Sequence, residues 1–169
     1  MKIDALVRNN VKNISPYSSA RDDFKNEFDN KLIYLDANES PFGNVINRYP
    51  DNKHTELKKV VSDIKKVNVN QVIFGNGTDE IFDLIVRVFC NPYKDKIITL
   101  PPTYGMYDVI AKTNGVENIE IPLKSDFSID KNQILKLNST SIKVLFLCSP
   151  NNPTGNSFDT NNLTDLIKS

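Results

Sequence analysis

The chain has 169 residues, of which 39% are hydrophobic and 25% charged, the usual composition of a soluble globular domain with one core. Twenty-one basic residues balance twenty-one acidic ones, so no net charge draws the chain toward nucleic acid or an anionic membrane. No apolar run reaches the roughly 20 residues that cross a bilayer, and the N-terminus is not followed by a signal-type apolar core. We therefore expect a cytoplasmic protein that binds neither nucleic acid nor a membrane, and whose partners are recognised at local sites.

The first 50 residues are predicted to form an irregular arm. Polar clusters alternate there with short apolar segments, and Pro16, Pro41 and Pro50 interrupt the chain. Between residues 55 and 66 the pattern changes, because apolar residues recur at helical spacing and lysines occupy the other side. That segment is predicted to be an amphipathic surface helix.

Two apolar segments lie on either side of a glycine-containing turn in the middle of the chain. Residues 72–74 predict a short strand that stops at Gly75, and residues 77–89 predict a helix. Apolar side chains leave little polar face on this helix, so we expect it to be largely buried. Asp83 and Arg87 mark what polar face remains, at a spacing that allows them to pair.

Strands and helices alternate along the rest of the chain. Strands are predicted over residues 96–100, 116–121 and 144–147, and helices over 104–113, over 131–137 and from 163 onward. This alternation predicts the α/β class, with a parallel sheet and right-handed crossovers.

The cysteines and the single histidine indicate no metal centre. Cys90 and Cys148 are too few for a disulfide framework and lack the spacing of metal ligands, so both are predicted to be free thiols. Cys148 adjoins a candidate ligand loop, although a packing role is the more common one for such a thiol. His54 lies in a polar stretch before a helix, which favours a solvated or capping role over catalysis.

The sequence Gly75-Asn-Gly-Thr-Asp79 lies between a predicted strand and the first turn of a predicted helix. Free backbone amides and the helix dipole make such a place suitable for an anion, most naturally a phosphate. Gly77 would allow close approach of a ligand, and Thr78 would add a hydroxyl donor. We expect the Asp79 side chain to cap amides while its N–H faces the ligand, since its carboxylate would repel phosphate. Taken alone, the motif is better explained as an ordinary glycine turn with a Thr or Asp cap.

Two further loops follow predicted strands and should reach the same carboxyl edge of the sheet, where α/β proteins bind ligands. Residues 101–107 contain Tyr104 and Tyr107, which could stack on an aromatic ligand or pack under the loop; we favour packing for Tyr107. Residues 149–155 form a rigid loop with two prolines, in which Asn152 precedes a proline and can direct its amide at a ligand oxygen. An Asn-Pro-Thr-Gly sequence can equally be only a turn.

Taken together, these loops resemble the cofactor-binding segments of fold-type I pyridoxal-phosphate aminotransferases in order and spacing. The arm adds two sequences that resemble the histidinol-phosphate aminotransferase branch, Leu-Asp-Ala-Asn-Glu-Ser-Pro at 35–41 and Arg-Tyr-Pro-Asp at 48–51. One departure is Ser40, where the branch usually has Asn. The resemblance runs from about Tyr17 to the end of the chain and covers the front half of such an enzyme. It implies that residues 1–50 are an N-terminal arm and residues 51–169 the first, incomplete part of the large cofactor-binding domain.

The resemblance also implies roles for individual residues around pyridoxal 5'-phosphate. The turn at Gly77 and the amides of Thr78 and Asp79 would hold the cofactor phosphate. Tyr104 would stack on the pyridine ring, and the Asn152 side chain would donate to the phenolic oxygen, which tunes the electronics of the ring.

Three residues of the arm have implied roles of a different kind. Tyr49 would reach across a homodimer interface to the phosphate held by the partner. Tyr17 and Asn38 would lie near the amino-acid substrate.

The family's Schiff-base lysine, the aspartate that pairs with the pyridinium nitrogen and the arginine that binds the substrate carboxylate are all expected beyond residue 169. No catalytic residue is therefore assigned, and the chain alone is expected to be inactive. The resemblance implies that the parent enzyme transfers an amino group between histidinol phosphate and 2-oxoglutarate, in histidine biosynthesis. Two alternatives remain open: a decarboxylase acting on a phosphorylated amino acid, and a non-catalytic module that binds a phosphorylated ligand.

Overall fold

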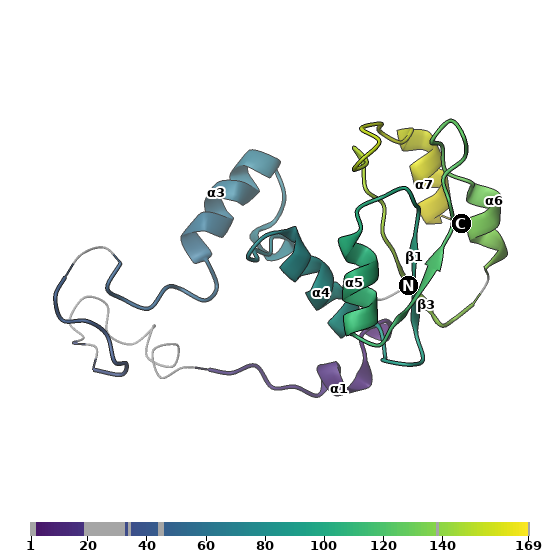
Figure 1. Ribbon diagram of the computed structural model, residues 1–169. Coiled ribbons are helices and arrows are strands. Elements are labelled where there is room, and N and C mark those ends of the chain that lie inside the picture. Colours follow the sequence, from purple (N-terminus) through teal and green to yellow (C-terminus); the bar gives the residue numbers. More distant parts are fainter. Residues whose placement is uncertain (1–2, 19–32, 34, 44–45, 138, 169) are drawn as a thin grey trace. The chain divides into compact units, whose positions relative to one another are not determined.

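The computed structural model describes residues 3–18, 33, 35–43, 46–137 and 139–168 (Figure 1). The chain divides into two compact units, one from the ranges 1–13 and 75–169 and the other from 14–74. This division differs from the predicted boundary at residue 50, because the start of the chain belongs with the sheet-containing unit. We describe each unit by itself.

A three-stranded parallel sheet lies at the centre of the first unit. Strand β1 (Lys96–Thr99) lies between β2 (Glu117–Glu120) and β3 (Ile142–Leu145). Ile98 pairs with Ile119 on one side and with Leu145 on the other. The predicted parallel α/β sheet is confirmed, although β3 begins and ends two residues earlier than predicted.

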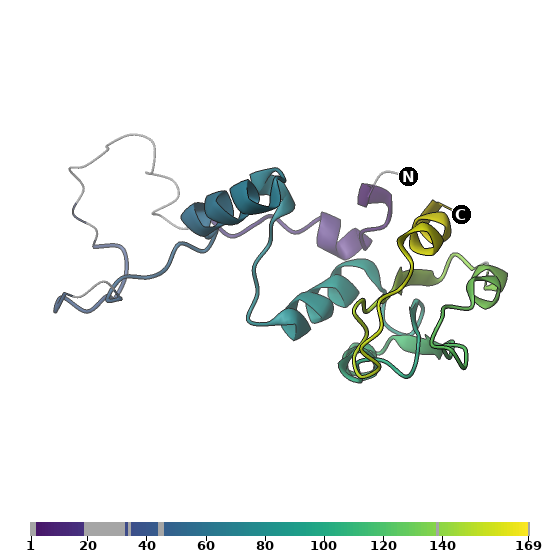
Figure 2. The ribbon, with the colours of Figure 1, turned by 90° about the horizontal axis from the view of Figure 1, so that it is seen from above.

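The sheet buries both of its faces. Successive side chains of a strand point to opposite faces, and Ile97 and Ile98 accordingly belong to two different core clusters. Helices α4 (Thr78–Phe89) and α5 (Met106–Thr113) contribute to the Ile97 cluster, whereas α6 (Lys131–Lys136) and α7 (Thr160–Lys168) contribute to the Ile98 cluster. Figures 1 and 2 show these two pairs of helices on opposite sides of the strands.

Helix α4 is present as predicted, but it is less buried than its apolar sequence suggested. Only Val86 is fully buried, and Leu84 is 40% exposed. Periodicity predicts which face can be buried, but the extent of burial depends on the neighbours that pack there. The predicted pair is confirmed: Asp83 accepts a hydrogen bond from Arg87 Nε at 2.6 Å, and this contact lowers the pKa of the Asp83 carboxyl.

The strand predicted at residues 72–74 is wrong, since this segment has no regular secondary structure and pairs with no described strand. An apolar run becomes a strand only where a neighbour completes its ladder of hydrogen bonds. The start of the chain was predicted to be irregular but contains regular structure. It contains the short helices η1 (Ile3–Ala5) and α1 (Asn9–Lys12), and Arg8 N donates to Val88 O at 3.0 Å.

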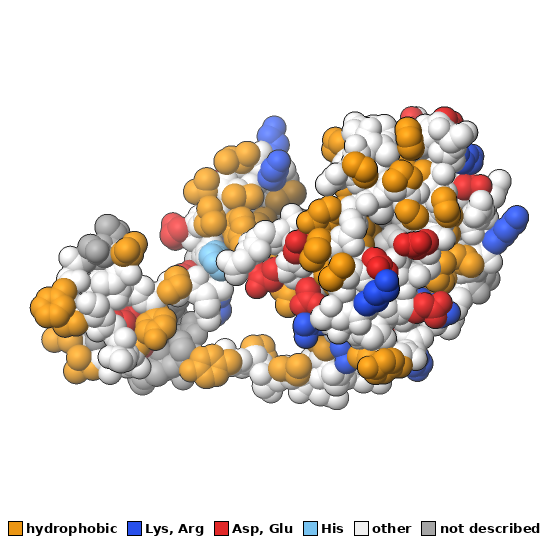
Figure 3. Space-filling view, viewed as in Figure 1, with side chains coloured by type: hydrophobic (Ala, Val, Ile, Leu, Met, Phe, Trp, Pro, Cys, Tyr) orange, Lys and Arg blue, Asp and Glu red, His pale blue; other side chains and the backbone are white. Residues whose placement is uncertain are grey.

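The second unit contains α3 (Thr55–Lys65), which confirms the predicted amphipathic helix, and η2 (Val69–Gln71). Asp51 holds the turn before α3, because its carboxylate accepts from the amides of Lys53 (3.0 Å) and Thr55 (2.9 Å), whereas the N-cap residue His54 makes no side-chain cap hydrogen bond. Hydrophobic side chains remain exposed along this helix, as Figure 3 shows; they include Leu57, Val60 and Ile64. Among the described residues of the whole chain, no helix is both long and apolar enough to cross a membrane.

Candidate functional site

Three loops of the first unit meet at the carboxyl edge of the sheet and line one cavity of about 340 Å³. The structure brings five predicted site residues to this cavity, and four further residues complete its lining. The five are Gly77, Thr78, Asp79, Tyr104 and Asn152, and the others are Asn76, Phe82, Tyr107 and Cys148.

The first wall of the cavity is the N-terminus of α4. Gly77 is the N-cap residue at φ +79, a conformation that suits glycine, and a Cβ atom there would meet no protein atom within 4 Å. The N-cap residue makes no side-chain hydrogen bond to the first turn. Among the described residues, the N–H groups after Gly77 therefore have no capping side chain, and they lie at the positive end of the helix dipole. This arrangement suits an anionic group.

The turn before α4 is held by Glu80, not by Asp79 as predicted. The Glu80 carboxylate accepts hydrogen bonds from the backbone and the side-chain amide of Asn76. Gly75 fits beneath this contact because it has no side chain: a Cβ atom there would lie 2.7 Å from Ile81 Cδ1 and 2.9 Å from Glu80 Oε2. The signal for this contact in the sequence is a Glu at the third residue of the helix.

The Asp79 carboxylate has a different partner, the hydroxyl of Tyr104, which donates to Asp79 Oδ2 at 3.2 Å. This hydrogen bond raises the pKa of Tyr104, because the proton it shares is held between two oxygens that both attract it. The contact joins the first loop to the second and orients the Tyr104 ring at the cavity.

Tyr107 is a packing residue, as predicted. Its ring stacks on Phe146 with centroids 4.5 Å apart, meets Phe82 edge-on, and is only 4% exposed. Burial raises the pKa of its hydroxyl. Tyr107 therefore supports the floor of the cavity and the ring of Tyr104, which it contacts edge-on at 5.7 Å.

Asn151, which the sequence reasoning did not single out, joins the second loop to the third. Its side chain is 3% exposed, accepts from Thr103 Oγ1 at 2.9 Å and donates to Pro102 O at 2.9 Å. It also donates to Thr154 Oγ1 at 2.6 Å. The next residue, Asn152, is exposed at the cavity. The carboxamide of Asn151 therefore holds the two loops together, whereas the carboxamide of Asn152 is available to a ligand in the cavity.

Comparison with known proteins identifies the family. The family model for class I and II aminotransferases matches residues 26–169. The chain belongs to this family. It is 52% identical over 166 residues to the histidinol-phosphate aminotransferase of Flavobacterium psychrophilum and 45% identical over 154 residues to that of Bacteroides thetaiotaomicron. These matches cover 98% and 91% of this chain but 48% and 44% of the relatives, so the chain spans about half the length of the curated relatives it matches.

Solved structures agree on the fold. The histidinol-phosphate aminotransferase from Clostridium acetobutylicum matches with a TM-score of 0.61 at 25% identity, over 72% of this chain and 34% of that chain. An alanine aminotransferase from Pyrococcus furiosus matches with a TM-score of 0.65 at 24% identity, over 71% and 33% respectively. The first unit therefore has part of the fold-type I aminotransferase architecture, as predicted.

Class I and II aminotransferases use pyridoxal phosphate, and the cavity of this family member fits that group. An uncapped helix N-terminus suits a phosphate, an aromatic side chain suits a pyridine ring, and a carboxamide suits a ring oxygen. Among the described residues, no group of three or more His, Cys, Asp or Glu side chains is placed to hold a metal ion.

The other predicted site residues, Tyr17, Asn38 and Tyr49, belong to the second unit. Tyr17 is 86% exposed and Tyr49 63% exposed, and Asn38 is also exposed. The neighbouring Glu39 connects the two arm motifs: its carboxylate accepts from Arg48 Nη1 at 2.6 Å and from Tyr49 N at 2.8 Å.

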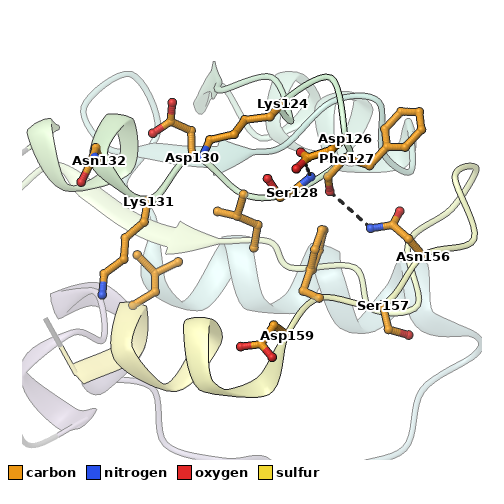
Figure 4. Close-up of a pocket in the computed structure, with 13 residues that line it drawn as sticks. Lys124, Asp126, Phe127, Ser128, Asp130, Lys131, Asn132, Asn156, Ser157 and Asp159 are labelled. Atoms are coloured by element: carbon orange, nitrogen blue, oxygen red, sulfur yellow. Dashed lines mark hydrogen bonds between the residues drawn. The ribbon is translucent and has the colours of Figure 1, made fainter.

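A larger cavity of about 500 Å³ lies between the loop at 124–132 and the segment from 156 to 166, and no predicted site residue lines it (Figure 4). Its carboxylates have structural partners. Asp126 accepts from Ser128 N at 2.9 Å, and Asp130 caps α6 through Gln133 N at 3.1 Å. These contacts with Ser128 and Gln133 lower the pKa of each carboxyl. The residues of this cavity therefore stabilise the loop.

Proposed function

We propose that this chain supplies the phosphate-binding and ring-binding part of a pyridoxal-phosphate-dependent aminotransferase that acts on histidinol phosphate and 2-oxoglutarate. One observation carries the proposal: the N-terminus of α4, the ring of Tyr104 and the amide of Asn152 line the same cavity. The relatives that match the chain over most of its length bear the name histidinol-phosphate aminotransferase, which supports the choice of substrate. By the same reasoning the enzyme is cytoplasmic and belongs to histidine biosynthesis.

Each wall of the cavity would perform one task. The N–H groups of Thr78 and Asp79 bind the phosphate, with the helix dipole behind them. Tyr104, oriented by Asp79 and Tyr107, lies against the ring face. Asn152 donates a hydrogen bond to the phenolic oxygen. When bound, pyridoxal phosphate supplies an electron-accepting ring that stabilises negative charge formed beside the amino group.

The second unit would complete the site in a homodimer. In this proposal Tyr49 reaches the phosphate held by the partner subunit, while Tyr17 and Asn38 approach the amino-acid substrate. Glu39 positions one of these residues, because its carboxylate accepts a hydrogen bond from the backbone N–H of Tyr49.

For the chain by itself we propose reversible cofactor binding without catalysis. None of the described residues that line the cavity is a lysine. Covalent attachment of the aldehyde needs a lysine amine at the site. Borohydride reduction of a saturated sample should therefore give no single labelled lysine on peptide mapping, and stoichiometric label at one lysine would refute this part of the proposal.

A proline substitution tests the phosphate site directly. Thr78 is the first residue of α4, where proline is well tolerated, and Thr78→Pro removes one N–H donor without removing the helix. Loss of a hydrogen bond to a charged group is worth about 1.5–3 kcal/mol, so the Kd for pyridoxal phosphate should rise roughly 10- to 100-fold. The control is Thr78→Ala, which lacks the hydroxyl as Thr78→Pro does but keeps the N–H, so it should bind pyridoxal phosphate more tightly than Thr78→Pro.

Titration followed by cofactor absorbance measures both variants. Pyridoxal, which lacks the phosphate, should bind the two variants equally. If Thr78→Pro and Thr78→Ala bind pyridoxal phosphate with the same Kd, the helix N-terminus is not the phosphate site.

A further inference from the structure

A third cavity of the first unit lies at the end of the parallel strands opposite to the candidate cofactor site. Its volume is about 500 Å³, and its lining includes Arg8, Asn91, Lys94 and Lys143. Lys143 is the second residue of β3, and Asn91 and Lys94 precede β1. These residues therefore lie at the amino end of the sheet, whereas the loops of the candidate cofactor site follow the carboxyl ends. We call this the basic cavity.

The charge of the basic cavity is of one sign. Its charged lining residues are Arg8, Lys94 and Lys143, and none of its described lining residues is acidic. In the described part of the chain, none of the three cations forms an ion pair. Like charges that face one space repel each other, and an anion in that space would relieve the repulsion.

Arg8 is held in place by the end of α4. Its backbone N–H donates to Val88 O at 3.0 Å, and its Nη1 donates to Arg87 O at 2.7 Å. These bonds also cover carbonyl oxygens that would otherwise repel an anion. The Nη1 atom of Arg8 thus has an acceptor at the end of α4. The Nε atom is buried and has no hydrogen-bond partner among the described residues. A buried donor without an acceptor is costly, but Nε is closed to solvent and does not meet an anion in the cavity, so Arg8 contributes to the cavity through the positive charge of its guanidinium.

The nearest buried acid is already engaged. Asp95 is 2% exposed, does not line the basic cavity, and accepts from Asn91 N at 2.7 Å and Asn91 Nδ2 at 2.8 Å. The pKa of the neighbouring Cys90 thiol depends on the charges around it. Burial first, and then Asp95, raise the pKa of Cys90 to about 11, while Lys143 and Arg8 act in the opposite direction. Both cations are thus close enough to influence one buried group.

We propose that the basic cavity is a second anion site, which binds a phosphomonoester or free phosphate dianion through Arg8, Lys94 and Lys143. It shares no residue with the candidate cofactor site, so the proposal does not rest on the proposed function. A cavity of about 500 Å³ leaves room for the organic part of a phosphorylated metabolite beside the phosphate.

Amide NMR of the full chain, titrated with inorganic phosphate at constant ionic strength, tests the proposal. No cofactor is added, because pyridoxal phosphate is itself a phosphomonoester, and shifts at residues 76–80 report the N-terminus of α4 separately. We expect saturable shifts at the amides of Arg8 and Asn91. Because each lysine contributes one charge contact, Lys94→Met and Lys143→Met should each raise the phosphate Kd about 3- to 10-fold, and the double variant should raise it further. A parallel titration with glycerol phosphate shows whether the organic part adds affinity.

Lys136→Met is the matched control, since Lys136 is an exposed lysine on α6 that lines neither cavity. The Kd of this variant for phosphate should equal that of the native protein. Thr78→Pro should also leave this Kd unchanged, which separates the basic cavity from the cofactor site. The proposal is overturned if phosphate gives no saturable shift, or if its shifts are confined to residues 76–80. It is equally overturned if the lysine double variant binds phosphate as the native protein does.

Discussion

At the scale of single residues, Glu39 shows how a carboxylate can serve a site without touching a ligand. Its side chain is 3% exposed and receives hydrogen bonds from both Arg48 and Tyr49. The two sequences that resemble the histidinol-phosphate branch are therefore joined into one local structure across the six residues between them. The Arg48 side chain is bound to Glu39 in that structure, whereas the Tyr49 side chain is exposed.

Replacement of Glu39 should loosen this structure. In Glu39→Gln an amide replaces a buried carboxylate that accepts two hydrogen bonds, one of them from a cation. With a discount for the partial exposure of Arg48, the local cost is on the order of 1–2 kcal/mol, which corresponds to a roughly tenfold faster hydrogen exchange at the Tyr49 amide. Glu56→Gln, which alters an exposed pair with Lys59, should leave that rate unchanged. A Tyr49 amide that already exchanges at the unprotected rate in the native protein would contradict this account.

The two free cysteines should differ sharply in reactivity. Cys90 is 1% exposed, and burial, followed by the charge of Asp95, raises its pKa to about 11. Cys148 is partly exposed and lines the candidate cofactor cavity. Because the thiolate is the nucleophile, Cys90 should stay protonated and inert at neutral pH and react only as the pH approaches 11.

Mass spectrometry of the iodoacetamide-treated protein at about pH 8 should therefore show label at one thiol, Cys148, because this thiol is partly exposed whereas Cys90 is buried. Saturating pyridoxal phosphate should slow that labelling. Label that appears first at Cys90, or an equal rate with and without the cofactor, would count against the cavity as described.

At the scale of elements, α3 begins after a turn that Asp51 holds. Asp51 accepts from the amides of Lys53 and Thr55 at the start of this helix. A hydrogen bond of this kind contributes about 0.5–1.5 kcal/mol, so Asp51→Ala should lower the helical signal of α3 in circular dichroism and in NMR chemical shifts. The matched control is Asp63→Ala, at an exposed position within the same helix, which should keep or slightly raise that signal. Equal helicity in both variants would show that the turn at Asp51 is dispensable.

The elements also show which information is local. Helices α3, α4 and α5 and strand β1 follow from periodicity and flanking turn residues, and these were predicted within two residues at either end. Residues 72–74 have an equally apolar sequence and form no strand, because strand formation depends on a partner that may lie far away in the chain. The short helices before residue 13 lack the length that makes a pattern visible.

The candidate site, too, was predicted only in part. The sequence predicted that three loops would meet at one sheet edge, and they line one cavity. Two of them follow parallel strands, whose carboxyl ends lie together, whereas the loop before α4 follows no described strand. It did not predict which of two adjacent asparagines would hold the loops, nor that Glu80 would hold the turn at Asn76. Those roles depend on side-chain direction and on contacts as remote as that between Thr103 and Asn151.

At the scale of the whole molecule, the two units are stabilised very differently. Every apolar residue that is fully buried among the described residues lies between Val86 and Leu166, in the first unit. In the second unit Ser62, a polar residue, is the only buried one among the described residues, and large apolar side chains of α3 remain exposed. Buried apolar area is the main source of folding free energy, so the second unit should open far more readily than the first.

Hydrogen exchange followed by mass spectrometry should resolve this difference. Peptides that cover β1 and α5 should retain deuterium protection longest, whereas peptides from α3 should exchange on a much shorter timescale, because local opening there exposes little additional apolar surface. The control lies within the first unit: α4, whose Leu84 is exposed but whose Val86 is not, should show intermediate protection. If α3 exchanged as slowly as β1, its apolar face would have to be covered in solution, which would point to self-association through that helix and could be checked by repeating the measurement at lower protein concentration.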